Sequence, residues 1–331
     1  MNHPCADTLR ARVEAIPAML RAWLPTALPR VPDALLRADP WVVTGVGASE
    51  GPARVLASEL RRAGRRAEFT PLSTFAPGRW SARDVDPRSA LVVVSQGLSP
   101  NATLALNARS AYAASALVTA AREVPDVTLA LRHPPDDEGG LLLRVQGPVA
   151  ATLCALRLVE SLAPGSTTLT RGVIEAIPDA YARALDEGDG VEPVRGEHLA
   201  LITTRGGYDL AHGLRWEWLE GPGGVDPPVW DVLQFAHGPF QLVADERATL
   251  VALEHADDPG GSALVDRLSE LLDPSRHRLL RFRASLPGAA GFFEHDARWS
   301  RLVTATLAAR PRDLVDWPGR GRAHALYDLG R

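Results

Sequence analysis

Short apolar runs and helical apolar spacings alternate along most of this chain. Two β-branched runs, Trp41–Val46 and Ala90–Ser95, each lead through a glycine-containing turn into a helical pattern, over Pro52–Gly64 and Ala102–Ala113. Strands whose residues are nearly all apolar are typical of parallel sheets that are buried on both faces. The alternation therefore predicts an α/β fold, with parallel sheets flanked by helices in three layers, as in nucleotide-binding folds.

The same order of elements starts again after a connecting segment. The second series begins with a strand at His198–Thr204, a glycine turn and a helix over Leu210–Glu220. At 331 residues the chain is longer than a single core readily supports, which favours two lobes. We expect a leading helical segment at 1–34, a first lobe at 35–165, a linker at 166–197, a second lobe at 198–310 and a tail at 311–331.

Composition excludes several classes of function. The formal net charge is -4 and the arginines are scattered, so nucleic acid is not an expected partner. The sequence shows no apolar run of membrane-spanning length and no signal-peptide pattern, and its two cysteines lie far apart. We therefore expect a cytoplasmic protein that does not associate with a membrane. All 36 basic residues are arginine, so a mechanism that needs a lysine amine is excluded.

The turn after the first predicted strand is a candidate binding element. Its residues Gly47, Ala48 and Ser49 stand between a strand and a helix, where backbone amides and the positive end of the helix favour an anion. A dinucleotide-binding fingerprint would need a third glycine where Glu50 stands, and a carboxylate there would repel pyrophosphate. A tight turn without function is the alternative interpretation.

A second polar turn follows the strand at 90–95. Ser95, Gln96, Gly97 and Ser99 stand there, and Asn101 follows at the start of the next helix. Ligands of parallel sheets gather beyond the carboxyl ends of the strands, so both turns could face one pocket. The alternative for Ser99 is a helix N-cap.

These turns resemble those of the sugar isomerase (SIS) family. Val43–Ser49 and Val92–Gln96 look like its two phosphosugar-binding turns, and Gln234–Pro239 looks like the His-Gly-Pro segment in the isomerase half of glucosamine-6-phosphate synthase. Glu14–Leu20 and Thr204–Tyr208 follow in the family's order, so the likeness spans most of residues 12–310. The resemblance implies two tandem SIS lobes, a sugar or sugar-phosphate ligand and a homodimer.

The phosphate-binding turn of the family is only partly matched. Ser95 and Gln96 agree with the family's Ser-Gln-Ser-Gly-x-Thr turn, whereas Gly97 replaces its second serine and Pro100 its threonine. Loss of each hydroxyl reduces the free energy of binding a charged phosphate oxygen by about 1.5 to 3 kcal/mol. Ser99 and Asn101 are the hypothetical substitutes, and the phosphate site is otherwise weakened or lost.

The resemblance also implies catalytic residues. His237 matches the family's ring-opening histidine, and Glu220 matches its catalytic glutamate if one residue is deleted near Tyr208; Glu217 lies one helical turn away. The family's lysines have no counterpart, and arginine can supply a charge but no neutral amine. Alternative interpretations are a solvated helix face for both glutamates and a backbone-bonded turn residue for His237.

We therefore expect proton transfer between aldose and ketose, with Glu220 as base and His237 as acid/base. Amidotransfer is not expected, because a glutaminase lobe would have to precede the sugar lobes, and no metal or cofactor motif is present. A non-catalytic sensor of sugar derivatives, and a deglycase or lyase acting on an amino-sugar adduct, are the alternatives.

Overall fold

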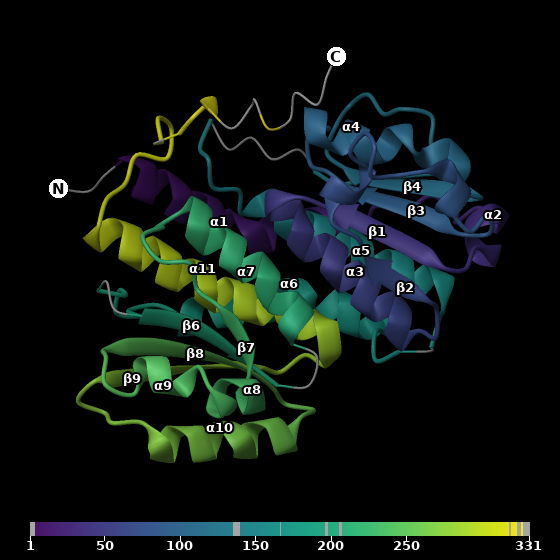
Figure 1. Cartoon of the computed structure of the whole chain (residues 1–331). Helices are drawn as coiled ribbons and strands as arrows, with labels where there is room; N and C mark the ends of the chain where they lie inside the picture. Colours follow the sequence, from purple (N-terminus) through teal and green to yellow (C-terminus); the bar gives the residue numbers. More distant parts are fainter. Residues whose placement is uncertain are drawn as a thin grey trace. The chain divides into compact units, whose positions relative to one another are not determined.

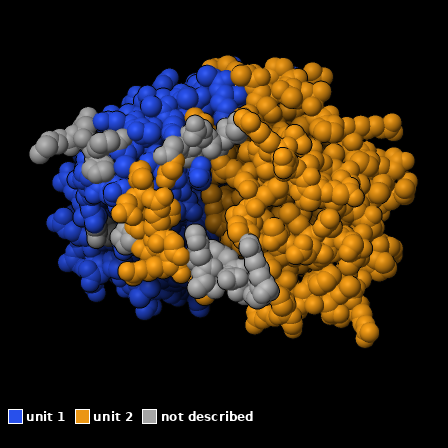
Figure 2. Space-filling view, turned by 90° about the horizontal axis from the view of Figure 1, so that it is seen from above, with its two compact units in different colours: residues 1–20, 141–145, 175–314 blue, residues 21–140, 146–174, 315–331 orange. Residues whose placement is uncertain are grey.

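The computed structural model describes residues 4–134, 140–165, 167–195, 198–204, 207–317, 319–322 and 326. Contacts between residues divide the chain into two compact units, which Figure 2 shows in blue and orange. One, here called the five-stranded unit, comprises residues 21–140, 146–174 and 315–331. The other, the four-stranded unit, comprises residues 1–20, 141–145 and 175–314. Each is described separately.

The five-stranded unit contains a parallel sheet with the strand order β2-β1-β3-β4-β5. Its strands are β1 (Trp41–Gly45), β2 (Ala67–Phe69), β3 (Ala90–Val94), β4 (Ala114–Thr119) and β5 (Leu129–Arg132). Every residue of β3 and β4 is buried, because helices or turns cover both faces of these central strands.

Helices cover both faces of this sheet (Figure 1). On one face lie α3 (Glu50–Arg62) and α5 (Gln146–Leu162), which pack against each other. On the other face, α4 (Pro100–Asn107) packs on β3 and on the short 3₁₀ segment Leu72–Phe75. The short helix α2 (Asp33–Arg37) precedes β1. The crossover from β2 to β3 contains only 3₁₀ turns, so part of the sheet is covered by irregular chain.

The four-stranded unit has a second parallel sheet, in the order β7-β6-β8-β9. Its strands are β6 (His198–Thr203), β7 (Val229–Asp231), β8 (Ala248–His255) and β9 (His277–Ala284). Its helices are α1 (Pro4–Trp23, which ends in the other unit), α6 (Arg171–Glu187), α7 (Tyr208–Glu220), α8 (Val232–His237), α9 (Phe240–Val243), α10 (Pro259–Leu271) and α11 (Phe292–Ala309).

Alternate side chains of β6 and β8 point to opposite faces of this sheet. Ile202 and Leu250 join an apolar cluster that contains Val232 and Phe235 of α8 and Val265 of α10. Figure 1 shows α8, α9 and α10 on this face, and α7 and α11 on the other. Both faces of the central strands are thereby removed from water.

The predicted α/β class, with two parallel sheets flanked by helices, is confirmed. Most predicted strands and helices are present, with ends shifted by a few residues. The structure adds the three-residue edge strands β2 and β7 and the long helix α11, none of which the apolar pattern predicts. The helix expected at Ala102–Ala113 ends at Asn107. Among the described residues, no helix is long and apolar enough to span a bilayer.

Candidate functional site

The two polar turns of the five-stranded unit lie side by side at one edge of its sheet. Strands β1 and β3 are parallel neighbours, and their last residues, Gly45 and Val94, stand opposite each other in register. The turns that follow therefore leave the sheet at the same carboxyl edge. Strand order also reverses here, because β2 lies on one side of β1 and β3 on the other. Such a switch point is the usual place for a ligand in open α/β sheets.

The first turn requires its glycines. A Cβ atom on Gly45 would lie 2.5 Å from the carbonyl oxygen of Ser49, so no larger residue fits without a shift of the backbone. Gly47 has a φ of 60°, a left-handed conformation that glycine adopts readily. Residues Gly47–Ser49 form a 3₁₀ turn that contacts α5 and leads into α3. The turn is partly exposed to solvent.

Three polar side chains at this edge have no protein partner. Within the described part of the chain, the side chains of Ser49, Ser95 and Gln96 form no hydrogen bond. Ser95 is 5% exposed, whereas Ser49 and Gln96 are half-buried. Hydroxyl and amide groups at a carboxyl edge that make no internal hydrogen bond can bind the oxygens of a ligand. The register of β1 and β3 places the two turns at the same edge of the sheet, and the binding role of these residues stays a prediction.

The backbone of the second turn is fixed from the neighbouring strand. Thr119, at the end of β4, is fully buried, and its Oγ1 donates a hydrogen bond of 3.1 Å to the carbonyl oxygen of Gln96. The amide of Ala120 donates to the same oxygen at 3.0 Å. Leu98 has a φ of 52°, which lets the chain turn sharply before α4. The Gln96 main chain is therefore held while its side chain is not.

Ser99 and Asn101 bind each other. The Ser99 hydroxyl donates to the Asn101 side-chain oxygen, and Ser99 makes no side-chain cap for α4. Ser99 therefore stands at the N-cap position of α4, as the capping interpretation predicts, but its side chain makes no capping hydrogen bond. Asn101 is 8% exposed. Replacement of the missing serine and threonine by Ser99 and Asn101 stays a prediction, as does a binding role for the exposed Gly97.

His133 lies at the same edge of the sheet and was not predicted as a candidate. It follows β5, and its amide donates to the carbonyl oxygen of Thr119. Burial lowers the pKa of its imidazole to about 4, so the ring is neutral at pH 7. Nδ1 lies 3.0 Å from the carbonyl oxygen of Pro134, which places the proton on Nδ1. Nε2 is then a buried acceptor that has no partner among the described residues.

The carboxylates predicted for catalysis lie in the four-stranded unit. Because β6 and β7 are parallel, α7 carries the chain back from the carboxyl end of β6, and Glu217 and Glu220 lie in its last turns. Glu217 is 7% exposed, and its Oε1 accepts a hydrogen bond of 2.8 Å from the Ser300 hydroxyl on α11. Glu220 is half-buried. Within this unit, the Glu217 carboxylate is therefore part of the packing between α7 and α11.

His237 is the last residue of α8 and is exposed. Asp231 is the N-cap residue of this helix, and its carboxylate accepts hydrogen bonds from the amides of Leu233 and Gln234, at 2.9 and 3.4 Å. His237 and the two glutamates belong to one compact unit, and the turns at 47–49 and 95–99 belong to the other. A shared pocket formed by these three regions stays a prediction.

A buried polar cluster adjoins Glu217. The Tyr181 hydroxyl on α6 donates a hydrogen bond of 2.9 Å to Asp296 Oδ2 on α11. Burial raises the pKa of Asp296 to about 7. The pKa of the Tyr181 hydroxyl is raised by its complete burial and by the charges of Asp296 and Glu217. None of these residues except Glu217 was a sequence candidate.

Solved structures share this fold over nearly the whole chain. Glucosamine-6-phosphate deaminase from Thermotoga maritima superposes with a TM-score of 0.74 at 13% identity, covering 94% of this chain and 97% of its own. Tagatose-6-phosphate ketose/aldose isomerase from Escherichia coli gives 0.69 at 17% identity, covering 96% and 98%. The C-terminal domain of glucosamine-fructose-6-phosphate aminotransferase from Francisella tularensis gives 0.63 at 14% identity, covering 94% and 98%.

No family model matches the sequence, and no curated protein sequence matches it. Identities of 13 to 17% establish the fold alone. The chain thus has the fold of the deaminase, of the ketose/aldose isomerase and of the C-terminal domain of the aminotransferase, as the sequence resemblance predicted.

Proposed function

We propose that this chain is a protein with two tandem SIS lobes, each a sheet between two helical layers, that binds a phosphorylated sugar or a related sugar derivative. The observation that carries the proposal is the group of Ser49, Ser95 and Gln96 side chains, which form no hydrogen bond with any described residue, at the strand switch point of the five-stranded sheet. Proteins of the same fold that are named for deamination, isomerisation and amino transfer all carry a sugar 6-phosphate in their names. These names share a class of ligand, the sugar 6-phosphates, but not a reaction, so they support the proposed ligand more than any one activity.

The test is a calorimetric titration with fructose 6-phosphate and with fructose. We expect the phosphate ester to bind at least about tenfold more tightly, because hydrogen bonds to a charged group contribute about 1.5 to 3 kcal/mol each. Ser95→Ala should weaken the binding of the ester by about tenfold or more. Ser110→Ala is the matched control, since Ser110 is exposed in the turn that precedes β4. Equal affinities for fructose 6-phosphate and fructose would show that the site does not bind the phosphate group.

For the reaction, we propose an aldose–ketose proton transfer, with Glu220 as base and His237 in ring opening. Glu217 is a second carboxylate of this proposal, and its hydrogen bond with Ser300 gives it a structural role as well. Glu220→Gln removes the proton acceptor with little change in shape. It should abolish the conversion of fructose 6-phosphate while leaving its binding within about twofold.

A non-catalytic binding protein is the second candidate function. It is favoured by the absence of lysine and by the use of the Glu217 carboxylate in helix packing. Binding of sugar phosphates without turnover of aldose, ketose or amino-sugar phosphates would establish it. Release of a sugar phosphate from an amino-sugar adduct would instead support a deglycase or lyase. A cytoplasmic homodimer without a metal or cofactor completes the proposal, and analytical sedimentation tests the dimer.

A further inference from the structure

A cavity of about 320 Å³ opens in the five-stranded unit, and its lining includes none of the residues of the two turns described above. Its floor is the face of β1 and β2 that no helix covers, where Val42 and Glu68 stand opposite each other in register. Its other side is the irregular crossover from β2 to β3, which supplies Trp80, Ser81 and Asp84. The volume is at the lower end of the range for sites of small molecules.

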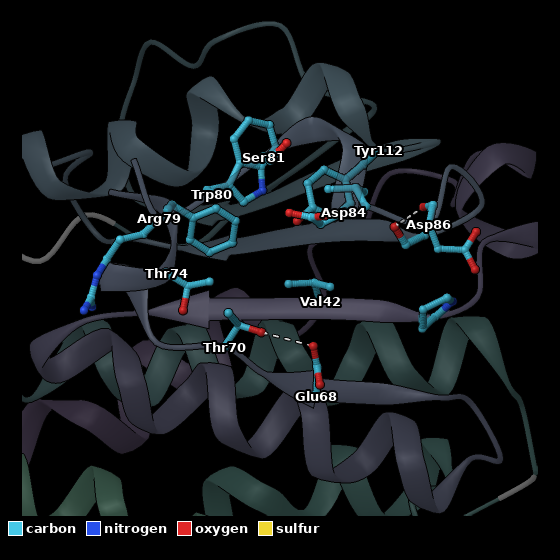
Figure 3. A pocket seen from close by; sticks show the side chains of 14 residues that line it. Val42, Glu68, Thr70, Thr74, Arg79, Trp80, Ser81, Asp84, Asp86 and Tyr112 are labelled. Carbon is cyan, nitrogen blue, oxygen red and sulfur yellow. Dashed lines mark hydrogen bonds between the residues drawn. The ribbon is translucent and has the colours of Figure 1, made fainter. Parts of the chain in front are cut away.

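Aromatic rings and carboxylates face each other across this cavity. Figure 3 shows Trp80 and Tyr112 on one side, and on the other Glu68 of β2 and Thr70, which follows β2. Trp80 and Tyr112 both line the cavity and are half-buried, so part of each side chain is accessible to a ligand. The pKa of the Tyr112 hydroxyl is raised, first by its burial and further by the negative charge of Glu68. The Glu68 carboxylate therefore interacts electrostatically with the Tyr112 hydroxyl across the pocket.

The charge of the lining is negative and only partly compensated. Asp86 is paired with Arg88, whose Nη2 lies 2.9 Å from Asp86 Oδ2. The Asp84 carboxylate makes no hydrogen bond or ion pair with any described residue, and Glu68 accepts only a long one of 3.4 Å from Thr70. Arg79 also lines the cavity, but in Figure 3 its guanidinium extends away from Trp80 and Glu68.

We infer that this cavity is a second binding site, distinct from the sugar-phosphate site, and that it takes a small organic cation with an ammonium group. Trp80 and Tyr112 would contact the cation through their ring faces, which attract positive charge. Glu68 and Asp84 would supply the opposing charge, and the hydroxyls of Thr70 and Ser81 would accept or donate hydrogen bonds. A phosphate or carboxylate ligand is disfavoured by the negative charge of the same two acids.

Choline and its neutral isostere 3,3-dimethyl-1-butanol test this inference, since the two differ in charge and hardly in shape. Calorimetry with the full chain should give a dissociation constant of about 1 mM for choline, as expected for a ligand of this size. The neutral isostere should bind at least about fivefold more weakly. Added salt should weaken the binding of choline.

Two variants locate the site. Glu68→Gln, on an exposed position of β2, should weaken choline binding by about fivefold, and Trp80→Leu by about tenfold. Asp33→Asn is the matched control, because Asp33 is an exposed acid on α2 that does not line the cavity. Ser95→Ala should leave choline binding unchanged, which separates this site from the sugar-phosphate site.

The inference is overturned if the neutral isostere binds as tightly as choline, or if choline shows no saturable binding at about tenfold above the expected constant. It is also overturned if Glu68→Gln and Trp80→Leu both leave the affinity unchanged while each variant keeps the circular dichroism spectrum of the wild type. Neither result bears on fructose 6-phosphate binding, which is measured separately.

Discussion

Tyr181 donates a hydrogen bond of 2.9 Å to Asp296 in the buried interior of the four-stranded unit. The pair joins α6 to α11, two helices that are far apart in the sequence. Ser300, one turn after Asp296 on α11, binds Glu217 of α7. Polar contacts between helices, and not only apolar packing, thus specify how α6, α7 and α11 come together.

The first prediction concerns the pH dependence of stability. The pKa of Asp296 is raised to about 7 in the folded chain, above its value in the unfolded chain. The folded state therefore binds the proton more tightly, and its stability must fall as pH rises toward and through 7. Between pH 6 and 8 we expect a loss of about 1 to 2 kcal/mol in the free energy of unfolding.

Asp296→Asn tests this prediction, because asparagine keeps an acceptor for the Tyr181 hydroxyl and cannot ionise. Urea unfolding at pH 6 and pH 8 should show that the variant lacks the loss seen in the wild type. Asp33→Asn, on the exposed helix α2, is the control and should retain it. An identical loss in wild type and Asp296→Asn would mean that another group is responsible.

His133 gives a prediction of opposite sign. Its folded-state pKa of about 4 lies below that of an unfolded histidine, so the unfolded chain binds more protons between these values. The contribution of His133 to stability should therefore rise as pH increases from about 4 to 6.5, by up to about 3 kcal/mol, and it opposes the fall that Asp296 causes over the same range. His133→Gln should flatten this rise. A histidine NMR titration measures the pKa directly, and a midpoint near 6.5 would contradict the account.

The tight first turn gives a third prediction. Gly45→Ala places a Cβ atom 2.5 Å from the Ser49 carbonyl oxygen, which forces the backbone of the turn to move. We expect a loss of about 2 to 4 kcal/mol in stability, together with loss of sugar-phosphate binding. Gly172→Ala is the control, since a Cβ atom there meets only the Thr170 hydroxyl at 4.0 Å. Unchanged stability and binding in Gly45→Ala would show that the turn is more plastic than described.

The sequence predicts the central strands well, because their apolar runs are long enough to be recognised as buried strands. β3 is buried along its whole length and appears as a continuous apolar stretch, and β1 and β8 each contain a run of mostly buried apolar residues. The edge strands β2 and β7 have only three residues each and are partly exposed, so no run or alternation marks them. Their pairing is decided by the neighbouring strand, which is a tertiary effect.

Helix α11 escaped prediction for a different reason. Its buried face contains Glu294, Asp296 and Ser300, each of which is hydrogen-bonded inside the unit. These polar residues interrupt the apolar period by which a buried helix is recognised. The candidate site shows the same limit. Ser95 and Gln96 stand in a recognisable turn, whereas His133 follows a short strand and becomes a candidate only when β5 is placed beside β4.

The central claim is that a sugar phosphate binds at the carboxyl edge of the five-stranded sheet. The most direct measurement is a crystal structure of the protein soaked with fructose 6-phosphate. We predict ligand oxygens within hydrogen-bonding distance of the side chains of Ser49, Ser95 and Gln96. A ligand bound elsewhere, with these three side chains still lacking partners, would contradict the account.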